Sequence, residues 1–431
     1  MSMTDTGRPS RYSWLIVMFL FLFMLINFAD KAVIGVTAGP IMRELGLTPS
    51  QFGLVGSSFF LLYTLSGIVT GFVVNRVQTR WALLAMGLIW AASQLPMIGS
   101  IGFATLIGCR IVLGAGEGPA YPVALHSVYK WFPNAKRTLP TAIIAQGASI
   151  GVVLALPALN HLIMHYSWHW AFGALGIIGL TWSIAWFAFG REGQLIETIT
   201  PASGYPFARV SYRQLLLNGT VVAACASGFG AYWGLSLLVA WLPSYLVKGL
   251  GYTQEQAGWL STLPWACSVV IVVGVGWLSQ RLLADGVSSR VGRGLIGGGA
   301  VAFGGVAMLL VPFVDAPAAN VALLALGISV PSVIYTLSPA IVSEFTPVSQ
   351  RGAMLAIIAA VSSLAGLLAP YVMGRVIESG PTALEGYHRG FLICGIIGLI
   401  GGLIGMALLR PERQAARFAV ANGAVVAVAA E

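Results

Sequence analysis

The chain has 431 residues, of which 57% are hydrophobic and only 9% are charged. Soluble globular proteins carry about 25% charged residues, so this composition excludes a soluble enzyme, a disordered scaffold and a nucleic-acid-binding domain. The net charge of +9 comes from 23 lysines and arginines against 14 acids. In a membrane protein such an excess is typical of basic cytoplasmic loops.

Apolar runs long enough to cross a bilayer recur along the whole chain. A spanning helix needs about 20 apolar residues, and we predict twelve such helices: 14–36, 51–74, 81–100, 103–129, 138–161, 168–190, 216–247, 255–283, 294–314, 318–344, 351–378 and 387–410. The sequence therefore predicts an all-α integral membrane protein with twelve transmembrane helices.

The distribution of basic residues between the loops predicts the orientation. Seventeen lysines and arginines fall in one set of predicted loops, together with both termini. The other set holds only four: Arg43, Lys248, Arg375 and Arg389. Because basic loops stay in the cytoplasm, we expect both termini to be cytoplasmic.

A polar stretch at 191–213 divides the chain into two groups of six predicted spans. The two halves share a similar polar segment at equivalent places. In the first half it is K-W-F-P-N-A-K-R at 130–137, after span 4, and in the second half it is S-E-F-T-P-V-S-Q-R at 343–351, after span 10. We predict a six-helix bundle at 1–190, a cytoplasmic linker at 191–213, a second six-helix bundle at 214–413 and a flexible tail at 414–431. Such duplication is typical of transporters that rock around a central site.

Four charged residues lie well inside predicted spans: Asp30 and Lys31 in span 1, and Arg110 and Glu117 in span 4. A charge in mid-bilayer costs at least roughly 2.5–3.5 kcal/mol, so each is a functional candidate. Arg110 and Glu117 are seven residues apart and share a helix face. The second half has no charge at comparable depth.

The sum of these four charges suggests a mechanism. It is zero when both acids are ionised and +2 when both are protonated, so protonation would free Lys31 and Arg110 to bind a carboxylate. The alternative is that Asp30 with Lys31, or Glu117 with Arg110, forms a buried pair that only fixes helix packing.

N-F-A-D-K-A in span 1 and R-I-V-L-G-A-G-E-G-P-A-Y-P in span 4 resemble the anion:cation symporter family of the major facilitator superfamily. W-L-P-S-Y-L at 241–246 and L-A-G-L-L-A-P at 364–370 resemble spans 7 and 11 of the same family. The resemblance implies proton-coupled symport of a small organic anion, with Asp30 and Glu117 carrying protons. It also implies that Arg110 and Lys31 hold the anion and that Tyr63 contacts the substrate.

Three positions depart from the pattern of sugar-acid members. Phe28, Ala148 and Ala359 stand where hydrogen-bonding side chains are expected. A hydroxyl-rich cargo would leave polar groups unpaired there, at about 1–3 kcal/mol each. We therefore expect an aromatic or short aliphatic acid, with a sugar acid as the alternative cargo.

Further residues are candidates for lining the substrate cavity. The aromatic ones are Tyr121, Tyr232, Trp233 and Tyr335, and hydroxyls from the second half are Ser338 and Ser362. Each of the aromatic side chains could instead serve bundle packing or an interfacial belt. In the loops after spans 2 and 8, Asn75 and Gln280 replace acids that usually stabilise one gate in this superfamily.

Two rival functions remain. A proton-driven exporter or exchanger of the same fold is less favoured, because Gly147 and Gly151 have the spacing of an antiporter motif but Val152 replaces its proline. A non-transporting sensor would need a signalling domain. We expect no enzymatic activity, no cofactor, no metal and no nucleic-acid partner, and a monomer in the lipid of a bacterial inner membrane.

Overall fold

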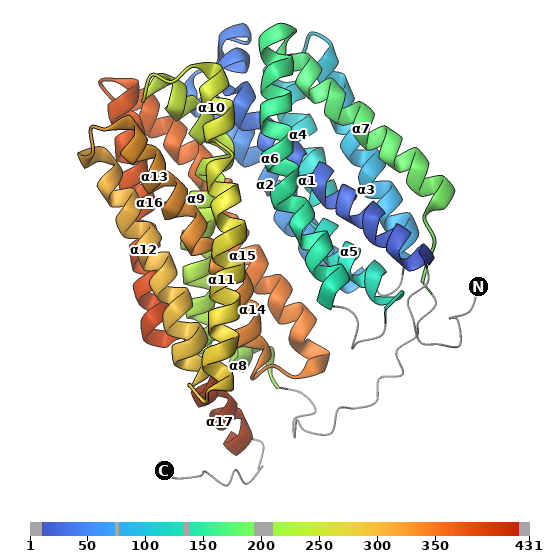
Figure 1. Ribbon diagram of the computed structural model, residues 1–431, viewed down its shortest axis with the longest axis vertical. Coiled ribbons are helices and arrows are strands. Elements are labelled where there is room, and N and C mark those ends of the chain that lie inside the picture. The colour runs from blue at the N-terminus through green and yellow to red at the C-terminus, as the bar shows by residue number, and fades with distance from the viewer. Residues whose placement is uncertain (1–10, 74–76, 133–137, 194–209, 422–431) are drawn as a thin grey trace. The chain divides into compact units, whose positions relative to one another are not determined.

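The computed structural model describes residues 11–73, 77–132, 138–193 and 210–421, and their regular structure is entirely helical (Figure 1). In the first half the helices are α1 (Arg11–Glu44), α2 (Pro49–Val73), α3 (Thr79–Gln94) with η1 (Leu95–Ile98), α4 (Phe103–Glu117), α5 (Ala120–Tyr129), α6 (Thr138–His165) and α7 (Trp168–Phe189). Each predicted span of this half coincides with one or two of these helices.

The second half begins with the short helix α8 (Tyr212–Leu216). It continues with α9 (Gly219–Lys248), α10 (Gln254–Leu260), α11 (Leu263–Ala284), the π-helical turn η3 (Arg290–Leu295), α12 (Ile296–Leu310) and η4 (Val311–Phe313). It ends with α13 (Pro317–Ser329), η5 (Val330–Val333), α14 (Ile334–Ser343), α15 (Val348–Ser379), α16 (Ala383–Leu408) and α17 (Pro411–Ala421).

Eleven helical stretches among the described residues are long and apolar enough to span a membrane. The one predicted span that is not among these eleven is span 4, 103–129, which is split into α4 and α5 at Gly118 and Pro119. Proline has no backbone N–H and its ring clashes with the preceding turn, so the continuous helix expected from hydropathy is interrupted directly after Glu117.

The stretch expected to be a flexible tail begins inside a helix. α17 runs to Ala421, and Phe418 on it is buried with its ring centroid 6.1 Å from that of Phe345. Burial of this one large side chain gives the helix an anchor that composition alone does not reveal.

The chain forms two compact units. Unit 1 comprises Met1–Glu197, Leu237–Ala266 and Leu367–Tyr387, and unit 2 comprises Thr198–Ser236, Cys267–Gly366 and His388–Glu431. Unit 1 thus combines the first half with the end of α9, with α10, and with the junction of α15 and α16. The division into two six-helix bundles at residues 190 and 214 stays a prediction.

Glycine allows helix backbones to approach closely inside each unit. In unit 1, a Cβ at Gly114 of α4, or at Gly118 directly after it, would overlap the carbonyl oxygen of Phe59 or Tyr63 on α2. In unit 2, a Cβ at Gly305 of α12 would overlap the backbone of α16 at Leu399. Small residues at crossing points are the usual means of packing helices in lipid.

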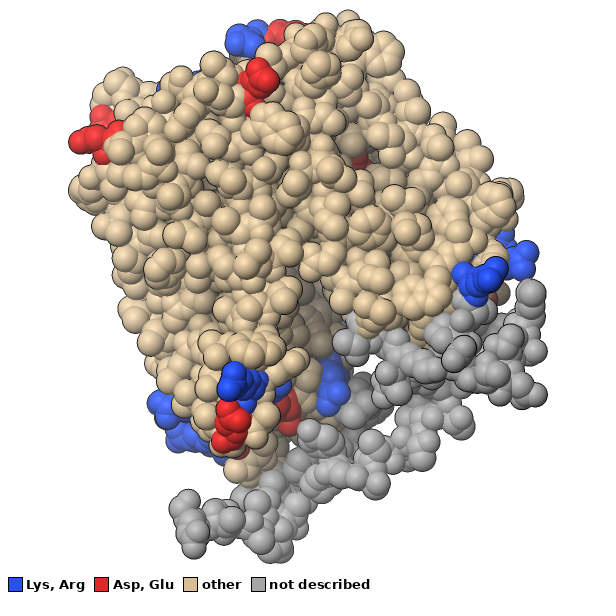
Figure 2. Space-filling view, in the orientation of Figure 1, with Lys and Arg blue, Asp and Glu red and all other residues tan. Residues whose placement is uncertain are grey.

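Charged side chains visible on the surface gather mostly toward the ends of the helices, and the surface between them is largely uncharged (Figure 2). This agrees with the predicted spans, because charged groups avoid the hydrocarbon layer.

Candidate functional site: a buried charge cluster in unit 1

Four charged side chains are buried among the described residues, and all four belong to unit 1. Their exposed fractions are 1% for Asp30, 9% for Lys31, 2% for Arg110 and 1% for Glu117. These are the four residues singled out from the sequence. We call them the charge cluster.

Lys31 of α1 is held by two partners. Its Nζ lies 3.2 Å from Oε2 of Glu117 on α4, and it donates a 2.6 Å hydrogen bond to Oδ1 of Asn27, one turn earlier on α1. The ion pair joins residues from two different helices. The two pairs considered from the sequence, Asp30 with Lys31 and Glu117 with Arg110, are not the salt bridge that the structure contains.

Arg110 occupies the other side of the cluster. Its Nη1 donates a 3.4 Å hydrogen bond to the backbone carbonyl of Asp30, and its guanidinium carbon lies 4.7 Å from the centroid of the Phe59 ring. The Asp30 carboxyl is within electrostatic reach of Glu117, Arg110 and Lys31. One helix face of α4 therefore supplies both a cation and an anion to the same two residues of α1.

The glycines of α4 explain how these groups meet. Gly114 and Gly118 bring the α4 backbone against α2 at Phe59 and Tyr63, so both aromatic rings border the cluster. The Tyr63 ring centroid lies 5.1 Å from Lys31 Nζ, and the Phe28 ring centroid lies 4.4 Å from it. A cation over a ring face is stabilised by about 0.5–2 kcal/mol.

Sequence reasoning missed several members of the site. Asn27 precedes Lys31 by four residues, a spacing that places both on one face of α1, and it could have been found by that signal. Gln94 at the end of α3 is buried and lies near enough to Asp30 to act on its carboxyl group. Phe59 carries no signal, because an apolar residue in an apolar span is unremarkable by sequence.

Phe28 contributes an apolar wall. Its ring stands edge-on to Trp265, with centroids 5.9 Å apart. Of the other two positions that are expected to depart from the sugar-acid pattern, Ala148 is half-buried and Ala359 is exposed. Gly151 packs where its Cβ would crowd the Leu25 backbone, so the Gly147–Gly151 spacing serves contact between α6 and α1.

The remaining candidates are distributed as follows. Tyr121 on α5 is 38% exposed and belongs to unit 1. In unit 2, the rings of Tyr232 and Tyr335 lie edge-on with centroids 6.2 Å apart. Trp233 is buried with its ring centroid 5.8 Å from that of Phe229. The structure thus brings Tyr63 together with the four charged candidates of the first half and pairs Tyr232 with Tyr335 in the second half.

The two serines differ. The Ser362 hydroxyl donates to the Ile358 carbonyl of its own helix and faces Gly228, where a Cβ would overlap it. Ser362 therefore packs where α15 crosses α9. The Ser338 hydroxyl is buried and has no hydrogen-bond partner among the described residues. A buried hydroxyl in that condition is rare.

Charged contacts also occur at the helix ends. In unit 1, Glu192 after α7 accepts hydrogen bonds from Thr79 Oγ1 and from the Arg80 N–H at the start of α3, and it pairs with Lys130. Burial raises the pKa of Glu192, but the hydrogen bonds from Lys130, Arg80 and Thr79 outweigh it, so the pKa lies below its usual range.

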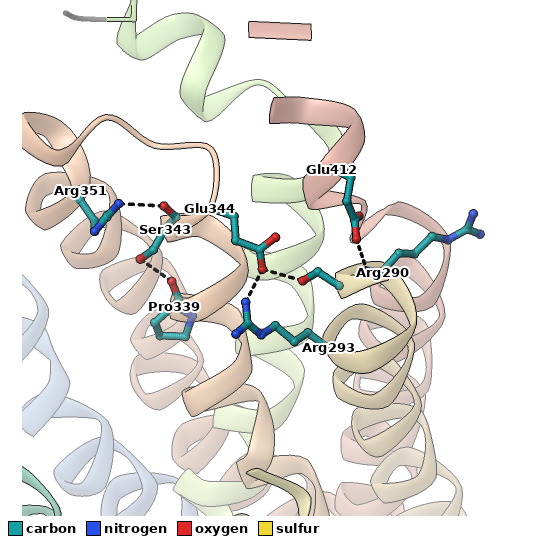
Figure 3. Close-up of polar contacts among 8 residues, drawn as sticks. Arg290, Arg293, Pro339, Ser343, Glu344, Arg351 and Glu412 are labelled. Atoms are coloured by element: carbon teal, nitrogen blue, oxygen red, sulfur yellow. Dashed lines mark hydrogen bonds and ion pairs between the residues drawn. The ribbon is translucent and has the colours of Figure 1, made fainter. Parts of the chain in front are cut away.

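Unit 2 has a similar arrangement (Figure 3). Glu344 accepts hydrogen bonds from Arg293 and Ser289, and Glu412 accepts one of 2.9 Å from the Arg290 N–H at the start of η3. Gln280, where an acid is usual, is exposed. Asn75 lies outside the described residues, so the prediction for its loop stays a prediction.

Comparison with known proteins agrees with this architecture. A galactonate transporter of Escherichia coli is 28% identical over 67% of this chain and 72% of its own. A hexuronate transporter of Bacillus subtilis is 24% identical over 92% and 94%, and a probable sulfoacetate transporter of Cupriavidus necator is 27% identical over 89% and 90%.

Solved structures with the same fold include a D-xylose–proton symporter, with a TM-score of 0.74, 18% identity and coverage of 94% of this chain and 99% of that one. The family model described as Major Facilitator Superfamily matches residues 20–336 and 321–429. The resemblance found in the sequence is thereby confirmed at the level of the family. The chain belongs to the Major Facilitator Superfamily and is a membrane transporter rather than an enzyme.

Proposed function

We propose that the protein is a proton-coupled symporter of a small organic carboxylate. The observation that supports this most strongly is the Lys31–Glu117 ion pair beside Asp30 and Arg110. Intramembrane charges of this kind mark ion and substrate pathways in transporters.

The chemistry follows from the pairing. With both acids ionised the cluster is neutral, and the Glu117 carboxylate is the ion-pair partner of the Lys31 ammonium. Protonation of Glu117 removes that partner and leaves Lys31 beside Arg110 with an uncompensated charge. A cargo carboxylate then replaces the lost anion, so a proton and an organic anion enter the site together.

The roles differ between the two cations. Arg110 carries a planar fork that suits a carboxylate in two-point contact, whereas Lys31 is a point charge on a flexible stem. We assign Arg110 to orienting the anion and Lys31 to sensing the protonation of Glu117. Asp30 is the second proton carrier, because Glu117, Arg110 and Lys31 all act on its carboxyl.

The cargo we favour has few hydroxyls. Phe28 and Trp265 provide an apolar wall next to Lys31, and a hydroxyl buried against such a wall stays unpaired. The probable sulfoacetate transporter among the relatives is named for a short acid without hydroxyl groups. A sugar acid is the second candidate, favoured by the relatives named for galactonate and hexuronate.

The test is uptake into proteoliposomes with an inward proton gradient, using labelled benzoate, sulfoacetate, galactonate and glucuronate. We expect accumulation of one or more of the first two that collapses when a protonophore is added. Accumulation of galactonate or glucuronate alone would move the assignment to the second candidate. Uptake of all four that ignores the gradient would contradict proton coupling.

Glu117→Gln provides the test at the level of the residue. We expect it to abolish gradient-driven accumulation while exchange of labelled for unlabelled cargo continues, because the neutral amide imitates the protonated acid. Glu255→Gln is the matched control, since Glu255 is an exposed acid on α10 of the same unit. Normal accumulation by Glu117→Gln would contradict the role in coupling.

A further inference from the structure

A second place in unit 1 brings two cations together, outside the charge cluster. A pocket lies between the ends of α1 and α9, and its lining includes Arg43, Lys248 and Gln254. Arg43 and Lys248 are both exposed and lie close enough for Arg43 to act on the charge of Lys248. They are 205 positions apart in the chain, so the fold alone creates this pair.

The convergence of these two residues is unusual for their side of the protein. Arg43 and Lys248 are two of the four basic residues predicted on the extracytoplasmic side, where such residues are scarce. Among the described residues no acid forms an ion pair with either of them. Glu44, the neighbour of Arg43, instead accepts hydrogen bonds from Trp168 and His169 on α7.

Helix ends explain only part of this charge. Each cation lies in the last turn of its helix, where the helix dipole contributes about half a negative charge. The two side chains contribute a charge of +2, and the two helix C-termini together contribute about −1, so the net charge in the pocket is about +1. A net positive charge of this size favours the approach of a monovalent anion.

The walls of the pocket leave room for an anion. Gly39 of α1 faces it, and a Cβ built at Gly39 would meet no atom within 4 Å. Gln254 closes one side, because its Nε2 donates hydrogen bonds to the Val36 carbonyl at 3.3 Å and to Oδ1 of Asn160 at 3.0 Å. Pro40 and Pro243 supply apolar surface.

We propose that this pocket is an anion-docking site, in which Arg43 and Lys248 bind a single carboxylate or phosphate group. That the pocket docks the cargo rests on the proposed function. That the pocket binds anions does not depend on it. A positive pocket concentrates anions and raises their rate of arrival.

The first test measures the local potential without requiring transport. A cysteine introduced as Val247→Cys, on the pocket wall, is reacted with a negatively and a positively charged methanethiosulfonate reagent. The unsubstituted protein gives the background from its four native cysteines. We expect the anionic reagent to react faster, and Arg43→Gln in this background to lower the ratio of the two rates by roughly tenfold.

Arg375→Gln is the matched control. Arg375 is exposed, belongs to the same unit and is predicted on the same side, but it does not line the pocket. Removing its charge should leave the ratio unchanged. A ratio near one in the parent, or an equal fall with Arg375→Gln, would overturn the proposal.

The second test identifies the source of the anion. Sodium acetate and inorganic phosphate should slow labelling of Val247→Cys in detergent if the site takes a dissolved anion. Slower labelling only in nanodiscs of phosphatidylglycerol, compared with phosphatidylcholine, would assign the site to a lipid headgroup. Absence of protection in every condition would refute an anion site.

A transport measurement separates this proposal from the proposed function. If the pocket docks cargo, Arg43→Gln should raise the KM for uptake several-fold and leave the maximal rate unchanged. Anion protection of the pocket in a protein that transports no carboxylate would uphold the site and refute the proposed function. An unchanged KM together with clear protection would refute only the docking step.

Discussion

The interiors of the two units are built from different chemistry. Unit 1 buries Asp30, Lys31, Arg110 and Glu117, whereas the buried polar side chains described in unit 2 are all uncharged. Both units use glycine at helix crossings, and both hold the start of a helix with an acid from a later segment. The contrast therefore lies in the core and not in the framework.

The largest effect is expected when the buried ion pair of unit 1 is replaced by uncharged side chains, as in the core of unit 2. Lys31→Met leaves the Glu117 carboxylate buried without its partner and should lower the free energy of unfolding by about 3–5 kcal/mol. The double variant Lys31→Met with Glu117→Leu should recover most of that loss, because a well-packed apolar pair replaces a buried ion pair at little cost. Denaturant or thermal unfolding of the purified protein measures both.

Transport by the double variant decides what the pair is for. We expect no gradient-driven uptake even where the fold is restored, since both the proton carrier and the cation are gone. Accumulation at the parent level would show that the pair only fixes helix packing. Arg375→Met, a substitution of an exposed cation in the same unit, serves as the control.

The packing of α4 on α2 offers the next largest effect. Gly118→Ala places a methyl group on the Tyr63 carbonyl oxygen, and such overpacking costs about 1–3 kcal/mol. Gly108→Ala on the same helix is the matched control, because its Cβ would meet no atom within 4 Å. We expect a lower melting temperature and weaker cargo binding for Gly118→Ala only. Equal behaviour of the two variants would contradict the close approach.

The acids at the helix starts test the shared framework. Glu192→Gln removes an ion pair and weakens the hydrogen bonds at the start of α3, and loss of such a helix-start interaction costs about 1 kcal/mol. Glu412→Gln, which affects one backbone N–H in unit 2, should cost less. Melting temperatures of both variants at neutral pH give the comparison.

The Glu192 contribution has a defined pH dependence. Its pKa is lowered in the folded protein, so its stabilisation is fully present at pH values above the pKa of Glu in the unfolded chain, about 4.3. That stabilisation is lost as the pH falls through the folded value. Melting temperature against pH should therefore be flatter on the acidic side for Glu192→Gln than for the parent. Parallel curves would contradict the assignment.

The smallest effect concerns the neutral interior of unit 2. Ser338→Ala removes a buried hydroxyl that has no hydrogen-bond partner among the described residues, so the melting temperature should stay the same. If Ser338 donates to the cargo, affinity should fall about tenfold, as for the loss of one hydrogen bond. Ser362→Ala, whose hydroxyl serves its own helix, should leave affinity unchanged. Unaltered affinity in both variants would remove Ser338 from the site.

Hydropathy predicted the spans well because each helix has to hide its backbone from lipid by itself. Span 1 was expected at 14–36 and lies within α1 at Arg11–Glu44. The break at Pro119 was missed because hydropathy describes only how apolar the run is, whereas the turn signal lies in the Gly118–Pro119 pair. The helix of the C-terminal segment was missed because it depends on Phe418 meeting Phe345, a contact distant in sequence.

The members of the charge cluster could be predicted, but their pairing could not. Intramembrane charge is costly, so Asp30, Lys31, Arg110 and Glu117 stand out in any apolar span. Which acid meets which cation depends on how α4 lies against α1 and α2, and that is set by Gly114 and Gly118. The Arg43–Lys248 pocket could not be predicted either, because its two cations lie at the ends of α1 and α9, 205 residues apart in the chain.

The interruption at Pro119 places Glu117 directly beside a break in its membrane span. Glu117 is the last residue of α4, and α5 begins at Ala120. A proline leaves the carbonyl four residues earlier without its helical donor, so the span bends there more cheaply than elsewhere. Glu117, the proton carrier that we propose, is thus adjacent to a point where the span can bend, and only Gly118 and Pro119 separate it from α5.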